Sequence, residues 1–412
     1  MRRAGPLLLV ALMPSIASAQ DSSVVADSTS CPSARLPVCP SASKPPRTGI
    51  RLTFVGDVNL GTRTLTHGLP ADSGRAFFSG VDSLLKGDLV IGNFEGVLAD
   101  TGVSEKCGKG FRIDTVSNQF APPDTAPPPA PKPPAPKPKP KPKTAHGKPK
   151  PKRMCFAFAT PTWMAPRLVE AGFTHLNLAN NHSNDMGAAA RAASDSILRS
   201  VGLKTYGPLG SIVIDSIVRG DSLTVVGMIG FTTYPFAYDL LDIPRSQAVV
   251  DSIRRMVDVL VVTFHGGAEG DKAQHVKPGP DSLAKEPRGD LRQWSHAVVD
   301  AGADLVVGHG PHVLRAMEFY NGKLIAYSLG NFATFRGFNV EGPAGLTTAL
   351  AVEFAADGTM LSATAPPLMQ RFGKGPSPDS LQRATKVLER LSKVDFGPTA
   401  ARIDLNGTIS PP

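Results

Sequence analysis

Apolar runs alternate with segments of helical periodicity from Arg51 onward, and this spacing predicts βαβ units. Apolar runs that end in polar residues predict buried strands at 51–57, 88–95, 174–182, 223–231, 258–266 and 304–310. Apolar positions at helical spacing predict helices at 76–85, 161–171, 187–201 and 379–393. Strands that alternate with helices favour parallel pairing within a sheet.

A predicted hairpin interrupts this alternation. Asn321-Gly322 stands between two apolar runs in 315–332, and an Asn-Gly pair in that position is a strong signal for a two-residue β-turn. A last strand is expected at 346–354. We therefore expect an α/β fold of the αββα type, with two stacked mixed sheets and helices on their outer faces. The domain is expected at 50–375, followed by a C-terminal helix and tail at 376–412.

Residues 1–19 have the layout of a secretory signal peptide. Arg2 and Arg3 precede the apolar run LLLVALM, and the run ASA ending at Ala19 is an A-x-A cleavage site. The apolar run is too short to span a bilayer. We expect a secreted or periplasmic protein after cleavage behind Ala19, or a membrane-anchored one if the peptide stays uncut. Residues 20–49 are a Pro/Ser-rich segment before the domain.

Four cysteines fit an oxidising compartment, because an even number allows complete pairing. Three connectivities are possible. We favour Cys31 with Cys39, which would close a small loop in a polar segment, and Cys107 with Cys155, which flank an unusual insertion. Four free thiols are the alternative.

Proline and lysine dominate this insertion, at 121–153, which cannot form a packed core. We expect it to be a disordered, extended polyproline II coil. Its nine basic residues against the single acid Asp124 contribute +8 of the formal net charge of +9, so the rest of the chain is close to neutral. Two interpretations stay open: electrostatic attachment to an anionic polymer, or a tolerated spacer. Because the insertion carries charge without interleaved aromatic residues, we expect no specific binding to a nucleic acid.

The predicted strand ends carry residues that suit a two-metal hydrolytic site. Such a site needs a bridging carboxylate, several imidazole or oxygen donors, and a group that protonates the leaving oxygen. The candidate metal ligands are Asp57, Glu95, Asn181, His265, His309 and His312. His182 follows Asn181, and neighbours on an extended chain face apart, so we expect it to do acid/base work with Asp185 holding its tautomer. His175 and His296 are expected to be structural.

Five motifs resemble, in order and spacing, those of the bacterial capsule synthesis family CapA. They are GDVNLG at 56–61, NFEG at 93–96, LANNHSNDMG at 178–187, FHGGAEG at 264–270, and GHGPHVL through YSLGNF at 308–332. The resemblance covers about 51–354. It implies a role in poly-γ-glutamate capsule production and a fold like that of the calcineurin-like metallophosphoesterases.

The same resemblance implies a role for each matching residue. Asp57 would bind the first metal, and Glu95 would bridge the two metals. Asn181 and His265 would bind the second metal, with His309 also on the second and His312 on the first. His182 would be the catalytic histidine. Glu269 would orient His265 or touch substrate.

Four departures from the family pattern bear on the metal count. Asn59 stands where metallophosphoesterases place a histidine, and Glu95 stands where they carry an aspartate. The family motifs GHHPH and HWGxEY read GHGPH and HGGAEG here, so Gly310 and the HGGAEG run replace bulky side chains. Asn59 is therefore a weaker first-metal donor, and one or two divalent ions (Mn, Zn, Fe or Mg) are expected. Asn331 is expected to fix a loop rather than to bind metal.

These features favour an exported CapA-like protein of capsule or poly-γ-glutamate synthesis or export with a metal-dependent hydrolase-type site. Its expected partners are an anionic cell-envelope polymer and membrane-embedded proteins of polymer synthesis or export. The alternative is a non-catalytic accessory protein that binds a polyanion in the envelope. The resemblance does not establish hydrolysis.

Overall fold

The computed structural model describes residues 49–108, 111–113, 119–121 and 155–412. The predicted signal peptide, the Pro/Ser-rich segment, the pair Cys31 and Cys39, and nearly all of the predicted insertion at 121–153 lie outside the described residues. Within those described segments, every helix is too short or too polar to cross a membrane.

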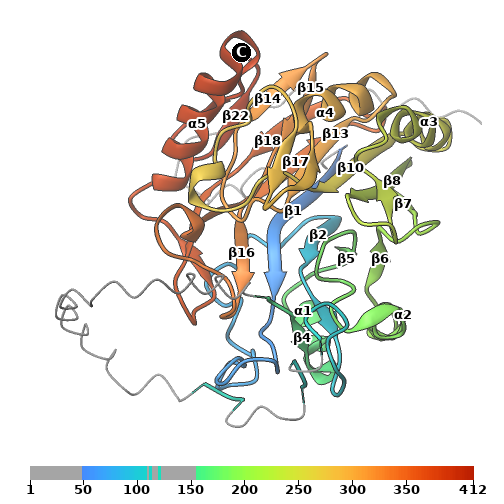
Figure 1. Ribbon diagram of the computed structural model, residues 1–412. Helices are drawn as coiled ribbons and strands as arrows, with labels where there is room; N and C mark the ends of the chain where they lie inside the picture. Colours follow the sequence, from blue (N-terminus) through green and yellow to red (C-terminus); the bar gives the residue numbers. More distant parts are fainter. Residues whose placement is uncertain (1–48, 109–110, 114–118, 122–154) are drawn as a thin grey trace, which may run out of the picture. The chain divides into compact units, whose positions relative to one another are not determined.

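Two mixed sheets form the centre of the described part of the chain (Figure 1). The larger sheet has eleven described strands: β1 (Ile50–Asn59), β2 (Leu89–Phe94), β5 (His175–Asn177), β6 (Lys204–Tyr206), β16 (Asn331–Thr334), β17 (Leu346–Phe354), β18 (Met360–Thr364), β19 (Pro367–Gln370), β20 (Pro376–Pro378), β21 (Arg402–Ile403) and β22 (Thr408–Ser410). The smaller has seven described strands: β7 (Val213–Arg219), β8 (Ser222–Thr232), β9 (Tyr238–Asp239), β10 (Val259–His265), β13 (Leu305–His309), β14 (Met317–Tyr320) and β15 (Lys323–Ala326).

The remaining elements are two-stranded ribbons and helices. The ribbons pair β3 (Val97–Leu98) with β4 (Ala159–Thr160), and β11 (Asp281–Leu283) with β12 (Glu286–Gly289). The helices of the described segments are α1 (Pro166–Glu170), α2 (Gly187–Ser200), α3 (Ile243–Arg254), α4 (Leu291–Asp300) and α5 (Arg383–Phe396), with short 3-10 helices η1 (Thr162–Met164), η2 (Asp271–Ala273), η3 (Gly342–Gly345) and η4 (Gly397–Thr399).

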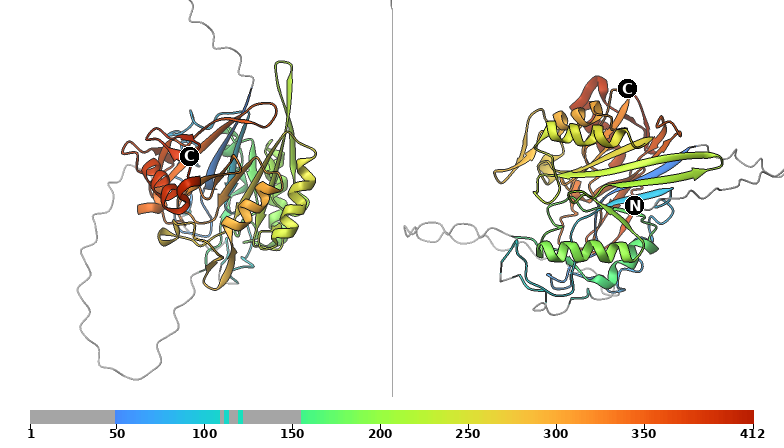
Figure 2. Two further views of the ribbon diagram at one scale, coloured as in Figure 1. Left: turned by 90° about the horizontal axis from the view of Figure 1, so that it is seen from above. Right: turned by 90° about the vertical axis from the view of Figure 1, so that its right-hand side faces the viewer.

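Buried side chains show how the layers stack. Along β10, Val261 packs in a core with Phe54 of the other sheet, whereas its neighbour Leu260 packs with Trp294 of α4. This alternation follows from the two-residue period of a strand. Residues of α1 and α2 pack on the outer face of the larger sheet, through Leu168 and Leu198. Helices therefore cover both outer faces, as the two views of Figure 2 show, and the expected αββα arrangement is confirmed.

The strand order brings several carboxyl ends to the same place. In the larger sheet β1, β2, β5 and β6 are parallel neighbours. In the smaller sheet β8, β10, β13 and β15 are parallel neighbours. The predicted hairpin is confirmed as β14 and β15, which pair in antiparallel register around Asn321-Gly322. After the hairpin the chain crosses to the larger sheet, where β16 pairs with β1.

Three local predictions were wrong. Residues 76–85 form successive turns rather than a helix, and several of their backbone hydrogen bonds join residues three apart, such as Ser79 N to Ala76 O at 3.2 Å. The helix expected at 161–171 is divided into η1 and α1 at Pro166, which has no N–H to continue the first segment. The expected C-terminal tail instead adds β21 and β22 to the larger sheet.

Candidate functional site

Polar side chains from both sheets meet at the ends of the parallel strands. Asp57 of β1 pairs with Asn93 of β2, and His265 of β10 pairs with His309 of β13. Parallel strands of one sheet end at the same edge, so segments far apart in the sequence deliver these residues together. All four are almost completely buried.

A compact carboxylate and imidazole cluster lies at this edge. Asp57, Glu95 and His265 each offer one ligand atom, and these atoms all lie within 4.8 Å of one another. Glu95 comes directly after β2, where its backbone N–H donates to the carbonyl of Val58. His265 Nδ1 lies 3.4 Å from Glu95 Oε2. Mixed carboxylate and imidazole donors suit a divalent transition metal.

Asn93 joins the two carboxylates and is absent from the sequence-based candidates. Its Nδ2 donates to Asp57 Oδ1 at 2.9 Å and to Glu95 Oε2 at 2.5 Å. Its Oδ1 accepts hydrogen bonds from the amides of Asn177 and Asn180, both at 3.1 Å. The sequence signal was its position two residues before Glu95 on the same strand end. Asn93 sets the spacing of the two carboxylates.

The two carboxylates have opposite pKa shifts. Burial, followed by the charge of Asp57, raises the pKa of Glu95 well above its ordinary value. Burial also favours neutral Asp57, but the hydrogen bond and charge of His312 outweigh it and lower the pKa of Asp57. Two adjacent buried carboxylates repel each other unless a cation lies between or beside them.

The closing histidines flank Asp57. His312 Nδ1 donates to Asp57 Oδ2 at 2.9 Å, and His309 Nδ1 lies 3.7 Å from Asp57 Oδ1. Burial lowers the pKa of His309 to about 4. Burial would also lower the pKa of His312, but the hydrogen bond and charge of Asp57 raise it to about 9. Both imidazoles therefore lie beside Asp57, in contrasting electrostatic settings.

Several buried atoms of the cluster have no hydrogen-bond partner in the described part of the chain. They are Glu95 Oε1, both ring nitrogens of His265, and His309 Nδ1. A buried polar atom without a partner costs on the order of 1–3 kcal/mol. Burial lowers the pKa of His265 well below its ordinary value, so its neutral ring offers a lone pair. These unpartnered oxygen and nitrogen atoms fit as ligands of a divalent cation.

His182 and Asp185 form a pair beside the cluster. His182 Nδ1 lies 2.6 Å from Asp185 Oδ2, and since a carboxylate only accepts, the imidazole donates this hydrogen bond. His182 Nε2 points to the other side, 4.0 Å from Glu95 Oε1. Burial lowers the pKa of His182, although Asp185 opposes this shift. Phe158 covers the ring, with centroids 4.4 Å apart.

The three candidate asparagines have different surroundings. The Asn59 amide donates to the backbone oxygen of Glu95 at 2.6 Å, and its Oδ1 accepts from Gly61 N, so both ends of the amide are used. Asn331 Nδ2 donates to three backbone oxygens, as a loop-fixing amide does. The Oδ1 atoms of Asn181 and Asn331 are both buried without a hydrogen-bond partner among the described residues. Both oxygens are therefore available for a ligand, whereas the Oδ1 of Asn59 is not.

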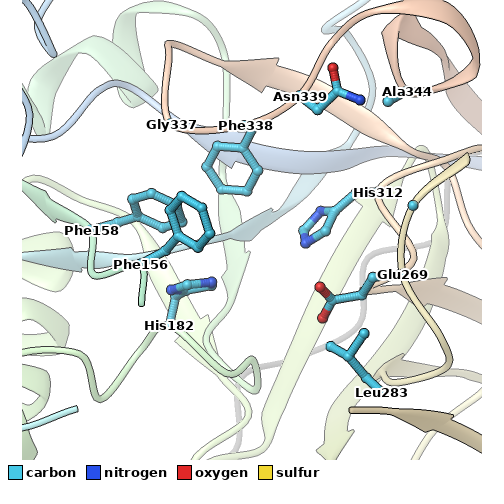
Figure 3. A pocket seen from close by; sticks show the side chains of 11 residues that line it. Phe156, Phe158, His182, Glu269, Leu283, His312, Gly337, Phe338, Asn339 and Ala344 are labelled. Atoms are coloured by element: carbon cyan, nitrogen blue, oxygen red, sulfur yellow. The ribbon is translucent and has the colours of Figure 1, made fainter. Parts of the chain in front are cut away.

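The cluster lies beside an open cavity of about 380 Å³ (Figure 3). Figure 3 shows Phe156, Phe158 and His182 on one side of it and His312, Glu269 and Leu283 on the other. A second hollow continues from His182 past Asn181 and Lys106 to Arg288. Arg288 is fully buried and donates to Glu269 Oε1 at 2.8 Å, which holds this carboxylate in the cavity wall. Glu269 thus lines both hollows.

The glycine replacements at 266 and 310 occur at one close contact. Gly310 has φ of +109°, and a Cβ there would lie 2.8 Å from the carbonyl oxygen of Gly266. A Cβ on Gly266 would lie 2.4 Å from Leu240. Gly266 N donates to His309 O at 3.0 Å, so these glycines let the two ligand-bearing loops approach each other.

A disulfide lies in the wall of the second hollow. It joins Cys107 to Cys155, and the adjoining residues Lys106 and Phe156 line the same hollow. The bond therefore ties together the two chain ends that flank the Pro/Lys-rich insertion, close to His182.

These features define a class: a two-sheet α/β protein with a buried carboxylate and histidine cluster of the kind that binds metal. The chain matches the model of the bacterial capsule synthesis protein PGA_cap over residues 141–213 and 235–335. It is 35% identical over 187 residues to the capsule biosynthesis protein CapA of Bacillus anthracis, covering 41% of this chain and 42% of that protein. It is 30% identical over 184 residues to the PGA biosynthesis protein CapA of Bacillus subtilis, covering 42% and 45%.

Over the matched residues the chain is similar to the bacterial capsule synthesis family, and the suspected resemblance to that family is confirmed. The matches span less than half the length of these relatives.

Among solved structures, a hypothetical protein from Thermus thermophilus overlaps with a TM-score of 0.41 at 14% identity, covering 78% of this chain and 100% of that one. A phosphatase from Mycoplasma pneumoniae overlaps with a TM-score of 0.41 at 12% identity, covering 79% and 95%. The two-sheet architecture itself rests on the strand pairing and core packing of this chain.

Proposed function

We propose that this protein is an exported accessory protein of capsule-like polymer synthesis or export, with a metal-dependent hydrolase-type site. The observation that carries the proposal is the buried Asp57, Glu95 and His265 cluster, whose unpartnered atoms stand next to the His182 and Asp185 pair. The names of the Bacillus relatives support capsule or PGA biosynthesis as the setting. An anionic envelope polymer is the proposed substrate class.

The proposed metal ligands are the cluster and its neighbours. Asp57, Glu95 and His265 would hold a divalent ion, with Asn181, His309 and His312 as further donors. A divalent ion in such a site supplies Lewis-acid chemistry, because it polarises the bond under attack and eases deprotonation of water. Asn59 is excluded from our ligand set, because both ends of its amide are bonded to backbone atoms.

His182 is the proposed acid/base group. Its Nδ1 proton is held by Asp185, so a proton is taken up or released at Nε2, which faces the cluster. Burial lowers the pKa of His182, so at neutral pH the ring is neutral and Nε2 first accepts a proton from the attacking water. The resulting imidazolium then gives a proton to the leaving oxygen or nitrogen. Arg288 holds Glu269 on the opposite wall of the cavity. There Glu269 contacts the part of the substrate beyond the scissile bond.

The test combines metal content with turnover. We would measure bound metal in the purified protein and the hydrolysis of a generic phosphodiester with added Mn²⁺, in the wild type and in His265→Ala. We expect stoichiometric metal and turnover that falls by at least about a hundredfold in the variant. His296→Ala is the matched control, since His296 is bonded to Glu318 away from the cluster. Wild-type protein without metal and without turnover would refute the proposal, whereas metal without turnover would favour a polyanion-binding role.

A further inference from the structure

Lys106 contacts the His182 and Asp185 pair from the side opposite the cluster. Its Nζ lies 3.1 Å from Asp185 Oδ1 and 3.4 Å from both His182 Nδ1 and the backbone oxygen of Asn181. The proton on His182 Nδ1 is directed at Asp185, so Lys106 cannot donate to that nitrogen. Its interaction is with the carboxylate.

The two oxygens of Asp185 have different partners. Oδ2 accepts from His182 Nδ1 at 2.6 Å and from Phe158 N at 2.7 Å. Oδ1 has no hydrogen bond among the described residues, so the ammonium of Lys106 is its neighbouring polar group there. The Asp185 side chain has no exposed surface, so water does not screen its charge. Lys106 therefore supplies the positive charge beside the oxygen that the imidazole and the Phe158 amide leave unbonded.

The chain around Lys106 is anchored to the same aspartate. Ser104 Oγ donates to the backbone oxygen of Asp185 at 2.8 Å and accepts from Cys107 N at 3.0 Å. Cys107 is bonded to Cys155, and Phe158, three residues further on, donates its N–H to Asp185 Oδ2. The disulfide therefore joins the two segments that hold Asp185, one carrying Lys106 and one carrying the Phe158 amide.

We propose that Lys106 is a positioning residue of this site: its ammonium fixes the Asp185 carboxylate so that Oδ2 faces His182 Nδ1, and the disulfide keeps Lys106 within reach. The inference rests on the proposed acid/base role of His182. An isolated surface ion pair gives about 0–1 kcal/mol, because the lysine chain loses rotamer freedom and water screens the charge. Here the acid is buried and the residue next to the lysine is cross-linked.

The kinetic test compares Lys106→Met with Lys106→Arg. We expect Lys106→Met to lower kcat for phosphodiester hydrolysis by about tenfold with KM changed less than about twofold, because Lys106 acts through Asp185 and not on substrate. Lys106→Arg should recover most of kcat. The matched control is Lys323→Met. The Lys323 side chain is 37% exposed, against 35% for Lys106, and it also pairs with a buried aspartate, Asp304, outside the site.

A second readout needs no turnover. In metal-free wild type, imidazole ¹⁵N spectra should show His182 as one neutral tautomer with the proton on Nδ1. In Lys106→Met and in the double variant Cys107→Ser and Cys155→Ser, its ring nitrogens should shift toward a mixture of tautomers. Lys323→Met should leave them unchanged.

The two readouts separate failure of this inference from failure of the proposed function. Unchanged His182 nitrogen shifts in a folded Lys106→Met variant would overturn the positioning role, whatever the kinetics. A wild type without turnover would refute the hydrolase function, while the nitrogen shifts would still decide the role of Lys106. If Lys106→Met does not fold, the serine double variant carries the same spectral test.

Discussion

Two buried glutamates of this molecule lie among histidines, and their surroundings differ. Glu318, in β14, accepts from His296 Nε2 and Tyr327 Oη, both at 2.7 Å, and from Thr399 Oγ1 at 3.1 Å. Glu95 has a donor, Asn93, on one oxygen only, and its other oxygen is unpartnered among the described residues. Both side chains are completely buried. Proximity of histidine and carboxylate therefore does not distinguish a structural pair from a ligand site.

The completeness of the hydrogen bonding does distinguish them. The Glu318 cluster has a donor for each carboxylate oxygen, so it stabilises the fold as it stands. At Glu95 a second carboxylate, Asp57, is close by, and both ring nitrogens of His265 are unpartnered in the described part of the chain. The Glu95 cluster is thus a destabilising arrangement that a cation would relieve. The predictions below test this contrast.

The largest expected effect is stabilisation by metal at the Glu95 cluster. Mn²⁺ or Zn²⁺ at a free concentration one hundred times its Kd should raise the free energy of unfolding of the wild type by about 2.7 kcal/mol. His265→Ala should lose this increase, and His296→Ala should keep it. Urea denaturation with and without a chelator measures the effect. An equal response of both histidine variants would show that the two clusters do not differ in the way described.

The same substitution at the two glutamates should have opposite effects on metal-free protein. Glu318→Gln should lower the free energy of unfolding by about 2 kcal/mol, because the amide nitrogen cannot accept from Tyr327 or Thr399. Glu95→Gln should leave it unchanged or raise it by up to about 1 kcal/mol, because it removes a charge beside Asp57. Denaturation at pH 7 in chelator compares the two. A larger loss at Glu95 than at Glu318 would contradict the contrast.

The sequence predicted the strand-end residues because each follows a long apolar run. Asp57, His265 and His309 were found in this way, and their parallel strands bring them to one edge. The helix at 187–201 was also predicted, and it corresponds closely to α2. The break at Pro166 shows where periodicity failed, since one proline outweighs the surrounding pattern.

The residues that sequence reasoning missed act through hydrogen bonds across the fold. Lys106 shows no distinctive spacing, and the spacing of Asn93 from Glu95 does not reveal that its amide joins two carboxylates. Asn59 is the converse case, because it matches a ligand position in the family pattern but its amide is bonded to nearby backbone atoms. Spacing predicts which edge a side chain reaches. It does not predict which of its atoms are already bonded.

The smallest expected effect concerns a third histidine and carboxylate pair, formed by His175 and Asp215. Asp215 Oδ2 lies 2.8 Å from His175 Nε2, and its other oxygen contacts Lys204 Nζ. The His175 hydrogen bond is the main cause that lowers the pKa of Asp215 from its ordinary value of 3.8 to about 2. A carboxyl whose pKa is lowered by folding stabilises the protein at pH values above its pKa in the unfolded state. This stability is lost as the pH falls through its pKa in the folded state.

Asp215→Asn should therefore lower the free energy of unfolding by about 1 kcal/mol between pH 5 and 8, where the Asp215 carboxyl of the wild type is ionised in both the folded and the unfolded protein. The difference from wild type should shrink below pH about 4 and be nearly absent at pH about 2. Urea denaturation of both proteins at several pH values measures it. A difference that persists undiminished at pH about 2 would show that packing of Asp215, rather than its charge, stabilises the pair.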